Sequence, residues 1–550
     1  MIIDRQFVKQ LDFDYEGYIS DIITKRRIRD WRADTPVFIS AQTGKGKTTF
    51  VLENILPMLS EWGGKMLIVC SRQALKYQYK HDLARQVAPE MLENFTESGL
   101  EKQHSFGLVD VYSYQELDFK KDLESYSIVI LDECHYFISD AIFNKSTYRV
   151  LHKILQTQKT ARRIYMTATP DETFPELIAG ERENLDKISL IKSMTGGVPY
   201  YSMGCCNKVI DEYLPHSIVY SFKRDYRYLV PFFFSSDERI IQLIQKTPPE
   251  EKTIIFVKNK NKGKELEKRF GGEAEYIDAD LKLDEKKDEL RSIVVKNTFD
   301  KKVLIVTKFL DVGVSLKDPK LKNIVIFTTN KTDVLQMIGR RRRLNKAEKI
   351  VLYLYVPKKD EIQKELKSLY YKRAEIVENI RSIGIDLKGR IDDIPFPVYI
   401  DNGRKDFNRF TLTAIDYLIE EKKNLLEYIH GKNEKDSIDN CIAGYYLKWL
   451  GMENEKIDNN RWIDKASDST VTAIEMIIEP VLDKLLTDEE EWKKIKRELL
   501  TLYENHEGVK TRKERKEEGL GVANIRKFFE KTGAVYSVNK KKNGYIFERG

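Results

Sequence analysis

The sequence predicts an α/β protein: two tandem units built on parallel β-sheets, followed by a mostly helical C-terminal region. From about residue 35 to residue 357, short runs of valine, isoleucine and leucine alternate with longer amphipathic stretches. This pattern is typical of strands that are buried on both faces and joined by covering helices. After Val356, apolar residues recur at helical spacing instead, which predicts helices.

The elements follow in order along the chain. The expected strands of the first unit are residues 36–40, 65–70, 108–113, 127–132 and 163–169, and those of the second are 252–257, 302–307, 323–329 and 350–356. We expect long helices over 361–380 and 409–429. A short helix over 522–533 and a hairpin over 534–548, turning at KKNG, end the chain.

These elements suggest four domains. We place the first at 1–246, including an irregular extension at 170–246, and the second at 247–357, with the linker TPPEEK at the boundary. A helical accessory domain follows at 358–507 and a basic module at 508–550.

Composition excludes several classes of protein. Of the 550 residues, 41% are hydrophobic and 33% are charged, which excludes collagen-like, low-complexity and wholly disordered chains. The net charge of +7 is too mild, over this length, to indicate a nucleic-acid binder by itself. Residues 509–550 alone carry twelve basic and five acidic residues, a net +7, so the excess is concentrated at the end of the chain.

The cysteines and the N-terminal residues bear on location. Cys70, Cys134, Cys205, Cys206 and Cys441 include no CxxC pair, so we expect no structural zinc and a reducing compartment. The start MIIDRQFVKQ lacks the apolar core of a signal peptide, and no apolar run approaches the ~20 residues of a membrane span. We expect a cytoplasmic protein with no membrane partner.

The segment Ala41–Thr49, AQTGKGKTT, follows the first strand. Except for Ala41 at its first position, it fits GxxxxGK[ST], the loop that binds nucleotide phosphates. Gly44 and Gly46 let backbone N–H groups face phosphate oxygens, Lys47 neutralises the β- and γ-phosphates, and Thr48 coordinates Mg²⁺. We therefore expect ATP and Mg²⁺ as cofactors, with the nucleotide bound by Thr43, Gly44, Lys45, Gly46, Lys47, Thr48 and Thr49.

The segment DECH, Asp132 to His135, ends the fourth strand. Side chains there emerge at the carboxyl edge of a parallel sheet. We expect Asp132 to hold the Mg²⁺ that Thr48 shares, and Glu133 to orient and deprotonate the attacking water. Two acids after a strand are often a solvated loop, but a phosphate-binding loop upstream favours catalysis.

The segment QMIGRRRR lies between two strands of the second unit and contains the pattern QxxGRxxR. One helix-like turn would put Arg340 and Arg343 on a shared face, from which both reach transferring phosphate charge. With Gln336, they are the expected catalytic residues of the second unit. The alternative is a solvated basic surface.

AQTGKGKT, DECH, the TAT of residues 167–169 and QMIGRRRR stand in the order of motifs I, II, III and VI of superfamily 2 helicases, and the chain resembles their DExH group over about residues 20–357. The resemblance implies two RecA-like domains with ATP in the cleft between them and a nucleic-acid strand laid across both. It also implies 3′-to-5′ polarity. Residues it places near the nucleic-acid backbone are Ser71, Arg72, Ser113 and Thr307, and those near the ribose are Gly313 and Ser315.

The sequence departs from the family pattern in two ways. No glutamine lies between Leu11 and Ala41 to read adenine, so selectivity for ATP over GTP is open; Arg27, Arg29 or Arg32 would be alternative stacking partners, unless they are surface charges. Val312 stands before Gly313 where DEAD-box relatives carry arginine, which disfavours that subgroup.

The C-terminal helix and the hairpin carrying Lys540, Lys541 and Lys542 resemble a winged-helix module that contacts nucleic acid. The alternative is a solvated tail. Asp392, Asp393 and Asp401 lack the lysine motif of a nuclease and are interpreted as loop acids.

The sequence thus predicts an ATP-dependent nucleic-acid helicase or translocase, with DNA preferred over RNA. Expected partners are nucleic acid and proteins of a replication, repair or restriction complex. The rival hypothesis is an NTP-gated nucleic-acid-binding scaffold that does not unwind processively. A packaging motor with a C-terminal nuclease is disfavoured, since no cluster of carboxylates supports it.

Overall fold

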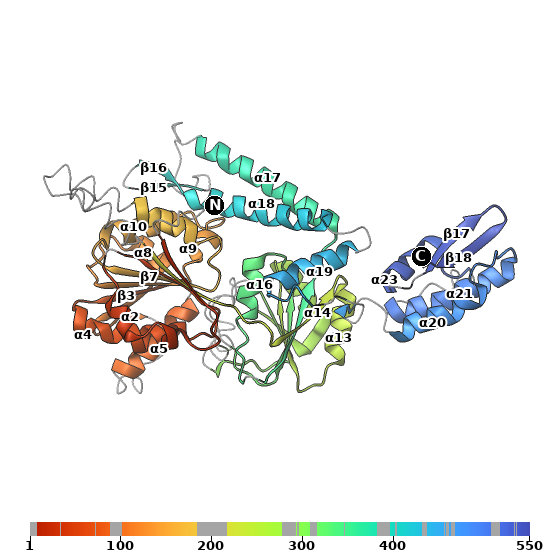
Figure 1. Cartoon of the computed structure of the whole chain (residues 1–550), viewed down its shortest axis with the longest axis horizontal. Coiled ribbons are helices and arrows are strands. Elements are labelled where there is room, and N and C mark those ends of the chain that lie inside the picture. Colours follow the sequence, from red (N-terminus) through yellow and green to blue (C-terminus); the bar gives the residue numbers. More distant parts are fainter. Residues whose placement is uncertain are drawn as a thin grey trace.

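Two parallel-sheet domains, a helical hairpin beside both of them and a C-terminal module make up the described part of the chain (Figure 1). The computed structural model describes residues 8–33, 35–71, 73–87, 102–183, 217–277, 293, 296–307, 316–345, 347–381, 397–401, 404–431, 437–455, 457, 461–463, 468–507, 518–532, 534 and 536–549. Within these ranges, no helix is long and apolar enough to cross a membrane.

Domain 1 is an eight-stranded sheet in the order β1-β8-β2-β7-β6-β3-β5-β4, in which β4 alone among these strands pairs antiparallel. All five predicted strands are confirmed, and their central residues are buried, as continuous apolar runs require. The strands are β1 (Val8–Phe13), β2 (Val37–Ser40), β3 (Met66–Cys70), β4 (Ser105–Phe106), β5 (Val109–Ser113), β6 (Ile128–Asp132), β7 (Arg162–Thr167) and β8 (Ser217–Phe222).

Helices cover this sheet on both faces, and each face has its own hydrophobic cluster. The helices are α1 (Ile19–Ile22), α2 (Lys25–Arg29), α3 (Lys47–Phe50), α4 (Leu59–Trp62), α5 (Gln73–Val87), α8 (Tyr114–Phe119), α9 (Tyr136–Ser139) and α10 (Thr147–Thr157). Between α3 and α4 the helix passes through a π turn (Val51–Ile55) and a 3₁₀ turn (Leu56–Met58). Pro57 lies in the 3₁₀ turn, and its missing N–H accounts for the interrupted α-helical hydrogen bonding.

Domain 2 is a six-stranded parallel sheet in the order β11-β12-β10-β13-β14-β9. The four predicted strands of this unit are confirmed. The elements are β9 (Leu229–Phe234), α13 (Asp237–Lys246), β10 (Lys252–Phe256), α14 (Lys260–Phe270), a 3₁₀ turn (Gly271–Glu273), β11 (Ala274–Ile277), β12 (Val303–Val306), β13 (Leu321–Ile326), α16 (Lys331–Ile338) and β14 (Ile350–Tyr355).

Sheet pairing places the boundary between the two domains earlier than the linker at 247 suggests. β8 lies between β1 and β2 of domain 1, whereas β9 pairs with β14 of domain 2. The chain therefore changes domain between Phe222 and Leu229, and TPPEEK is a loop within domain 2. In the sequence, β8 and β9 look like one continuous aromatic segment. Only their pairing with other strands shows that they belong to different sheets.

The helical hairpin is formed by α17 (Lys359–Arg381) and α18 (Arg409–His430), and the short strands β15 (Val398–Asp401) and β16 (Arg404–Phe407) precede α18. Both predicted long helices are confirmed. α18 contributes Phe410 and Ala414 to a cluster of domain 1, and Leu425 and Ile429 to a cluster of domain 2. This helix therefore bridges the two domains rather than belonging to a separate accessory domain.

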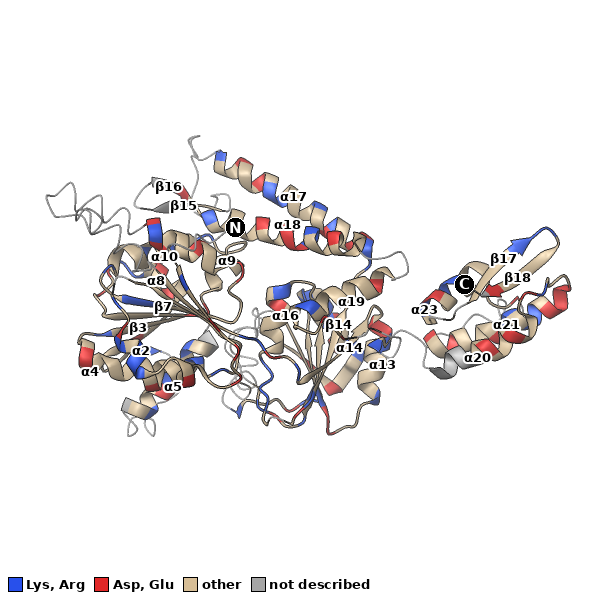
Figure 2. Cartoon of the chain, viewed as in Figure 1, with Lys and Arg blue, Asp and Glu red and all other residues tan. Residues whose placement is uncertain are grey.

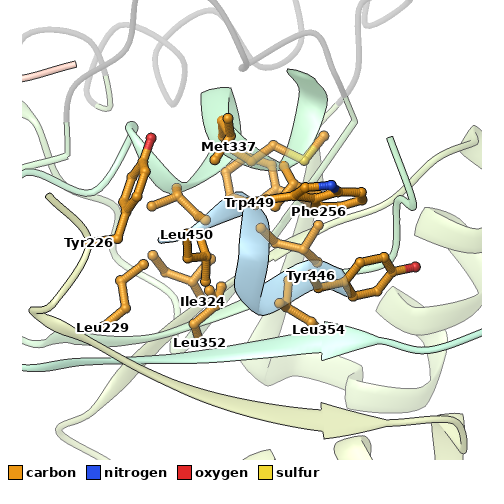
Figure 3. Close-up of a cluster of buried hydrophobic side chains, with 14 of the residues drawn as sticks. Tyr226, Leu229, Phe256, Ile324, Met337, Leu352, Leu354, Tyr446, Trp449 and Leu450 are labelled. Atoms are coloured by element: carbon orange, nitrogen blue, oxygen red, sulfur yellow. The ribbon is translucent and has the colours of Figure 1, made fainter. Parts of the chain in front are cut away.

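α19 (Ile438–Trp449) completes the core of domain 2. Its Tyr446 and Trp449, with Leu450 after them, pack against Phe256 and the strand residues around it (Figure 3). These aromatic side chains cover a sheet face that would otherwise expose Val, Ile and Leu.

The C-terminal module has its own hydrophobic cluster, which joins α20 (Asp468–Ile478), α21 (Glu489–Glu507), α23 (Val522–Thr532), β17 (Tyr536–Lys541) and β18 (Gly544–Arg549); a 3₁₀ turn (Glu479–Val481) follows α20. The predicted helix and antiparallel hairpin are both present. The packed unit begins upstream of the predicted boundary at 508, because α20 and α21 bury their apolar faces in the same core.

Candidate active site

The phosphate-binding loop joins β2 to α3. Gly44 and Gly46 have φ of +97° and +77°, a region that residues with a Cβ rarely adopt, so the loop needs glycine at both positions. α3 begins at Lys47, whose side chain is buried. Its Nζ lies 3.2 Å from Glu133 Oε1 and donates to the Ala41 carbonyl oxygen at 3.4 Å. The ammonium group of Lys47 and the carboxylate of Glu133 therefore lie next to each other.

Asp132, at the end of β6, is held by Tyr79 of α5. The Tyr79 hydroxyl donates to Asp132 Oδ2 at 2.8 Å and also hydrogen-bonds Thr48. Burial and the neighbouring Glu133 raise the pKa of Asp132 to about 6. A buried carboxylate is favoured by a nearby cation, so the oxygen atoms of Asp132 and Thr48 fit a hard divalent ion such as Mg²⁺.

Glu133 has a φ of +49°, which is uncommon for a residue with a side chain. Burial disfavours its charge, but Lys47, His135 and Arg340 outweigh burial and hold its pKa below the ordinary value. His135 Nδ1 lies 3.4 Å from Glu133 Oε2 and 3.2 Å from Thr167 Oγ1. The carboxylate is thus kept ionised and oriented.

A series of polar contacts continues from β7 of domain 1 to α16 of domain 2. Thr167 Oγ1 accepts from the Thr169 backbone N–H at 3.1 Å, and Gln336 Nε2 donates to Thr169 Oγ1 at 3.1 Å. Arg340 Nη2 in turn donates to Gln336 Oε1 at 3.3 Å. The structure therefore brings together Glu133, Gln336 and Arg340, which are far apart in the sequence.

The end of α16 lies directly on the phosphate-binding loop. A Cβ built on Gly339 would stand 2.6 Å from Thr43 Oγ1, so only glycine allows this approach. Thr43 Oγ1 is buried and has no hydrogen-bond partner among the described residues. A buried hydroxyl of this kind fits a loop that receives a polar ligand.

Arg343 does not share a face with Arg340. The prediction that one helical turn spans both residues is wrong, because α16 ends at Ile338. The exposed Arg343 guanidinium lies over the Tyr228 ring, 5.5 Å from its centroid, and Nε donates to the Asn345 carbonyl oxygen at 3.0 Å.

Two further residues of the loop differ in their surroundings. Lys45 is buried, and its Nζ donates to the carbonyl oxygens of Tyr15 and Glu16, at 3.1 and 2.7 Å. Its ammonium group therefore anchors the N-terminal segment. Thr49 is exposed on the first turn of α3.

The residues expected near the nucleic-acid backbone differ in their exposure to solvent. Ser71 and Ser113 are buried, and Ser113 Oγ caps α8 by accepting from the Glu116 N–H, so these hydroxyls do not reach solvent. Thr307 is half-buried at the end of β12, whereas Lys540, Lys541 and Lys542 are exposed at the hairpin tip (Figure 2). Outside the described residues lie Arg72, Cys205, Cys206, Val312, Gly313, Ser315, Asp392 and Asp393.

Sequence reasoning missed two tyrosines. Tyr79 occupies an ordinary helical position, and no local pattern signals its contact with Asp132. Tyr18 is 60% exposed, and its ring lies 3.2 Å from a Cβ built on Gly46, beside the loop. Of the arginines considered for base stacking, Arg29 pairs with Glu61 and Arg27 lies over the Phe13 ring.

Two family models match the chain. Residues 11–172 match the type III restriction enzyme res subunit, and residues 235–345 match the helicase conserved C-terminal domain. The two matched regions are helicase domains, in agreement with the resemblance to superfamily 2 helicases. The two matched regions carry the loop and DECH on one side of the cleft and QMIGRRRR on the other, so this helicase hydrolyses ATP between two RecA-like domains. Its DExH subgroup stays a prediction.

Solved structures similar to this helicase include Saccharomyces cerevisiae Dbp5 bound to RNA and ADP BeF3, with a TM-score of 0.41, 14% identity and coverage of 60% of this chain and 81% of that one. Mycobacterium smegmatis Lhr bound to ssDNA and AMP-PNP has a TM-score of 0.41, 14% identity and coverages of 65% and 48%. The type ISP restriction-modification enzyme LlaBIII bound to DNA has a TM-score of 0.40, 12% identity and coverages of 84% and 34%. No curated protein is significantly similar in sequence.

Proposed function

We propose that this helicase is a DNA-stimulated translocase that moves along a strand by opening and closing the cleft between its RecA-like domains. The observation that carries the proposal is the series of polar contacts from Glu133 through Thr169 to Gln336 and Arg340. These contacts couple the hydrolytic carboxylate of domain 1 to the position of domain 2. A change at the phosphate therefore changes the fit between the domains.

Each residue of the cleft has a role in hydrolysis. Lys47 binds the β- and γ-phosphates, and Glu133 orients the attacking water and accepts its proton. The water oxygen forms a bond to the γ-phosphorus while the bond from that phosphorus to the β–γ bridging oxygen breaks, and ADP leaves with the electron pair. Arg340 stabilises the negative charge of the transferring group.

Asp132 and Thr48 would hold Mg²⁺. Their shared contact with Tyr79 and the burial of Asp132 support this assignment. When bound, the ion neutralises phosphate charge during transfer.

The preference for DNA is supported by the C-terminal module. Its helices α20, α21 and α23 share one core with a β-hairpin whose exposed tip carries Lys540, Lys541 and Lys542. A basic hairpin beside a helix is the arrangement by which winged-helix modules contact duplex phosphates.

The first experiment is to measure ATPase rates with single-stranded DNA, duplex DNA and RNA, followed by strand displacement on the best activator. Stimulation by DNA with displacement of a strand supports the proposal. Stimulation without displacement favours the NTP-gated scaffold, and stimulation by RNA alone contradicts the preference for DNA.

The second experiment replaces Lys540, Lys541 and Lys542 with glutamine in the full chain. Each lost phosphate contact reduces the slope of log K against log salt by about 0.9, so the slope should fall by up to about three on duplex DNA. A matched control replaces the exposed α17 lysines Lys364, Lys367 and Lys372, which removes equal charge. Equal effects of the two triple variants would contradict a specific role for the hairpin.

A further inference from the structure

A turn at Gly339 and Arg340 follows α16, and the backbone is extended at Arg341. Arg341 forms a parallel bridge with Leu316: the Leu316 N–H donates to the Arg340 carbonyl oxygen at 2.7 Å, and the Arg342 N–H donates to the Leu316 carbonyl oxygen at 2.9 Å. In an extended segment, successive side chains point to opposite sides. Arg340 and Arg342 therefore share one side, and Arg341 and Arg343 share the other.

The contacts of the four arginines follow this alternation. Arg341 is buried inside domain 2, where Nε donates to the Leu321 carbonyl oxygen at 2.8 Å and the guanidinium pairs with Glu348. Arg343 is exposed, and its guanidinium lies over the Tyr228 ring. On the other side, Arg340 reaches Gln336 and contributes to holding Glu133 ionised.

Arg342 reaches across the cleft to domain 1. Its Nη1 lies 3.1 Å from the position of a Cβ on Gly44, the central glycine of the phosphate-binding loop, and the side chain is half-buried. Burial and the nearby Arg340 lower the pKa of Arg342 to about 10, while Glu133 favours its charged form. The guanidinium is therefore charged at neutral pH and lies against the loop that binds phosphates.

We propose that Arg342, acting with Arg340, is the second catalytic arginine of the cleft, in place of the Arg343 that the pattern QxxGRxxR selects. The proposal rests on the proposed function, since it takes ATP on the loop Ala41–Thr49 as the substrate. As the γ-phosphorus leaves the bridging oxygen for the water oxygen, negative charge grows on the bridging oxygen of ADP. Arg342, which enters from domain 2 beside Gly44, stabilises that charge only when the cleft is closed.

The test compares Arg342→Ala, Arg342→Lys and Arg343→Ala in the full chain, each checked for folding by its thermal transition. We expect Arg342→Ala to lower kcat at least about 100-fold with KM for ATP changed less than about threefold, because the arginine acts in the transition state. Arg342→Lys should recover part of kcat, since lysine keeps the positive charge but lacks the planar guanidinium that donates two parallel hydrogen bonds. Arg343→Ala should keep at least half of kcat.

Binding provides a readout that does not depend on turnover. The Arg342→Ala protein should bind ADP as tightly as the wild type but lose affinity for ADP with aluminium fluoride, whose planar geometry resembles the transferring group. Arg343→Ala should bind both as the wild type does. If Arg343→Ala loses kcat and analogue binding while Arg342→Ala keeps them, or if both lose them equally, the assignment is overturned. Absence of ATP hydrolysis by the wild-type chain would instead refute the proposed function.

Discussion

Among the described residues, domains 1 and 2 are joined across the nucleotide cleft and through helix α18, and the two connections differ in chemistry. The cleft is joined by polar contacts, such as Gln336 with Thr169 at 3.1 Å and Lys331 Nζ with Asp171 Oδ2 at 2.7 Å. α18 is joined by buried apolar side chains at both ends, including Phe410 in domain 1 and Leu425 in domain 2.

The difference is one of free energy. A hydrogen bond contributes about 1 kcal/mol net, because water replaces it when it breaks. Removing a buried phenylalanine side chain costs about 3–5 kcal/mol. We therefore expect the cleft to open and close while α18 stays anchored in both domains.

Polar contacts also lie beside the apolar anchors of α18. Lys422 Nζ donates to the Thr329 carbonyl oxygen at 3.0 Å, and the buried Glu421 accepts from the Lys331 N–H at 3.3 Å. Lys331 is the first residue of α16, whose other end carries Gln336 and leads to Arg340. α18 thus holds the beginning of the helix that completes the cleft.

The largest expected effect is on catalysis in the cleft. Lys47→Ala should lower kcat at least about 1,000-fold, because the variant lacks the cation that faces the phosphates, a loss of several kcal/mol. Glu133→Gln is the matched variant: it should also lose turnover but retain ATP binding, since Asp132 and Lys47 are intact. Steady-state ATPase and equilibrium nucleotide binding measure the pair. Wild-type turnover by the Glu133 variant would refute its assignment as the base.

The next largest effect is on the α18 anchor in domain 1. Phe410 is 4% exposed, so Phe410→Ala should lower the free energy of unfolding by about 3–5 kcal/mol. The exposed Glu420 on the same helix is the control, with Glu420→Ala expected within about 0.5 kcal/mol. Calorimetric unfolding measures both. A change below about 1 kcal/mol for Phe410→Ala would remove the contrast between cleft and helix.

A smaller expected effect is the contribution of Glu421 to the pH dependence of folding stability. Burial raises the pKa of Glu421 to about 7, and the negative charge of Asp333 adds to this rise. The positive charges of Lys422 and Lys331 lower the pKa but do not outweigh burial. The folded protein therefore binds a proton that the unfolded chain has released, and stability falls as pH rises from about 4.5 to 7, by up to about 3 kcal/mol.

Glu421→Gln removes this titration and keeps an acceptor for the Lys331 N–H. The difference in stability between variant and wild type should grow through that pH window and then level off. Denaturant unfolding at several pH values measures it. A constant difference would mean that Glu421 does not titrate there.

The smallest expected effect is at the rim of the cleft. Asp171 and Lys331 are 45% and 26% exposed, so their ion pair is screened by solvent. Asp171→Asn should change stability by at most about 1 kcal/mol, and the change should shrink at high salt. Thermal unfolding at low and high ionic strength checks this. A loss above about 2 kcal/mol, insensitive to salt, would show that the cleft is held as firmly as α18.

The sequence by itself determined the inner strands of the two sheets and the chemistry at their carboxyl ends. Strands such as 127–132 are recognisable because both faces are buried, which leaves a continuous apolar run. The loop around Gly44 and Gly46 and the acids of DECH are recognisable because each follows such a run directly. Short-range patterns carry this information, so no partner needs to be known.

Only the tertiary structure decided where the domains divide, which arginines face the cleft and what α18 does. β9 belongs to domain 2 because it pairs with β14, more than a hundred residues away, and nothing in its own residues states this. The alternation that turns Arg342 toward Gly44 and Arg343 toward Tyr228 depends on the bridge between Arg341 and Leu316. In the sequence, Tyr79, Glu421 and Phe410 look like ordinary helical residues. Their burial and their polar contacts depend on residues that are distant in the sequence.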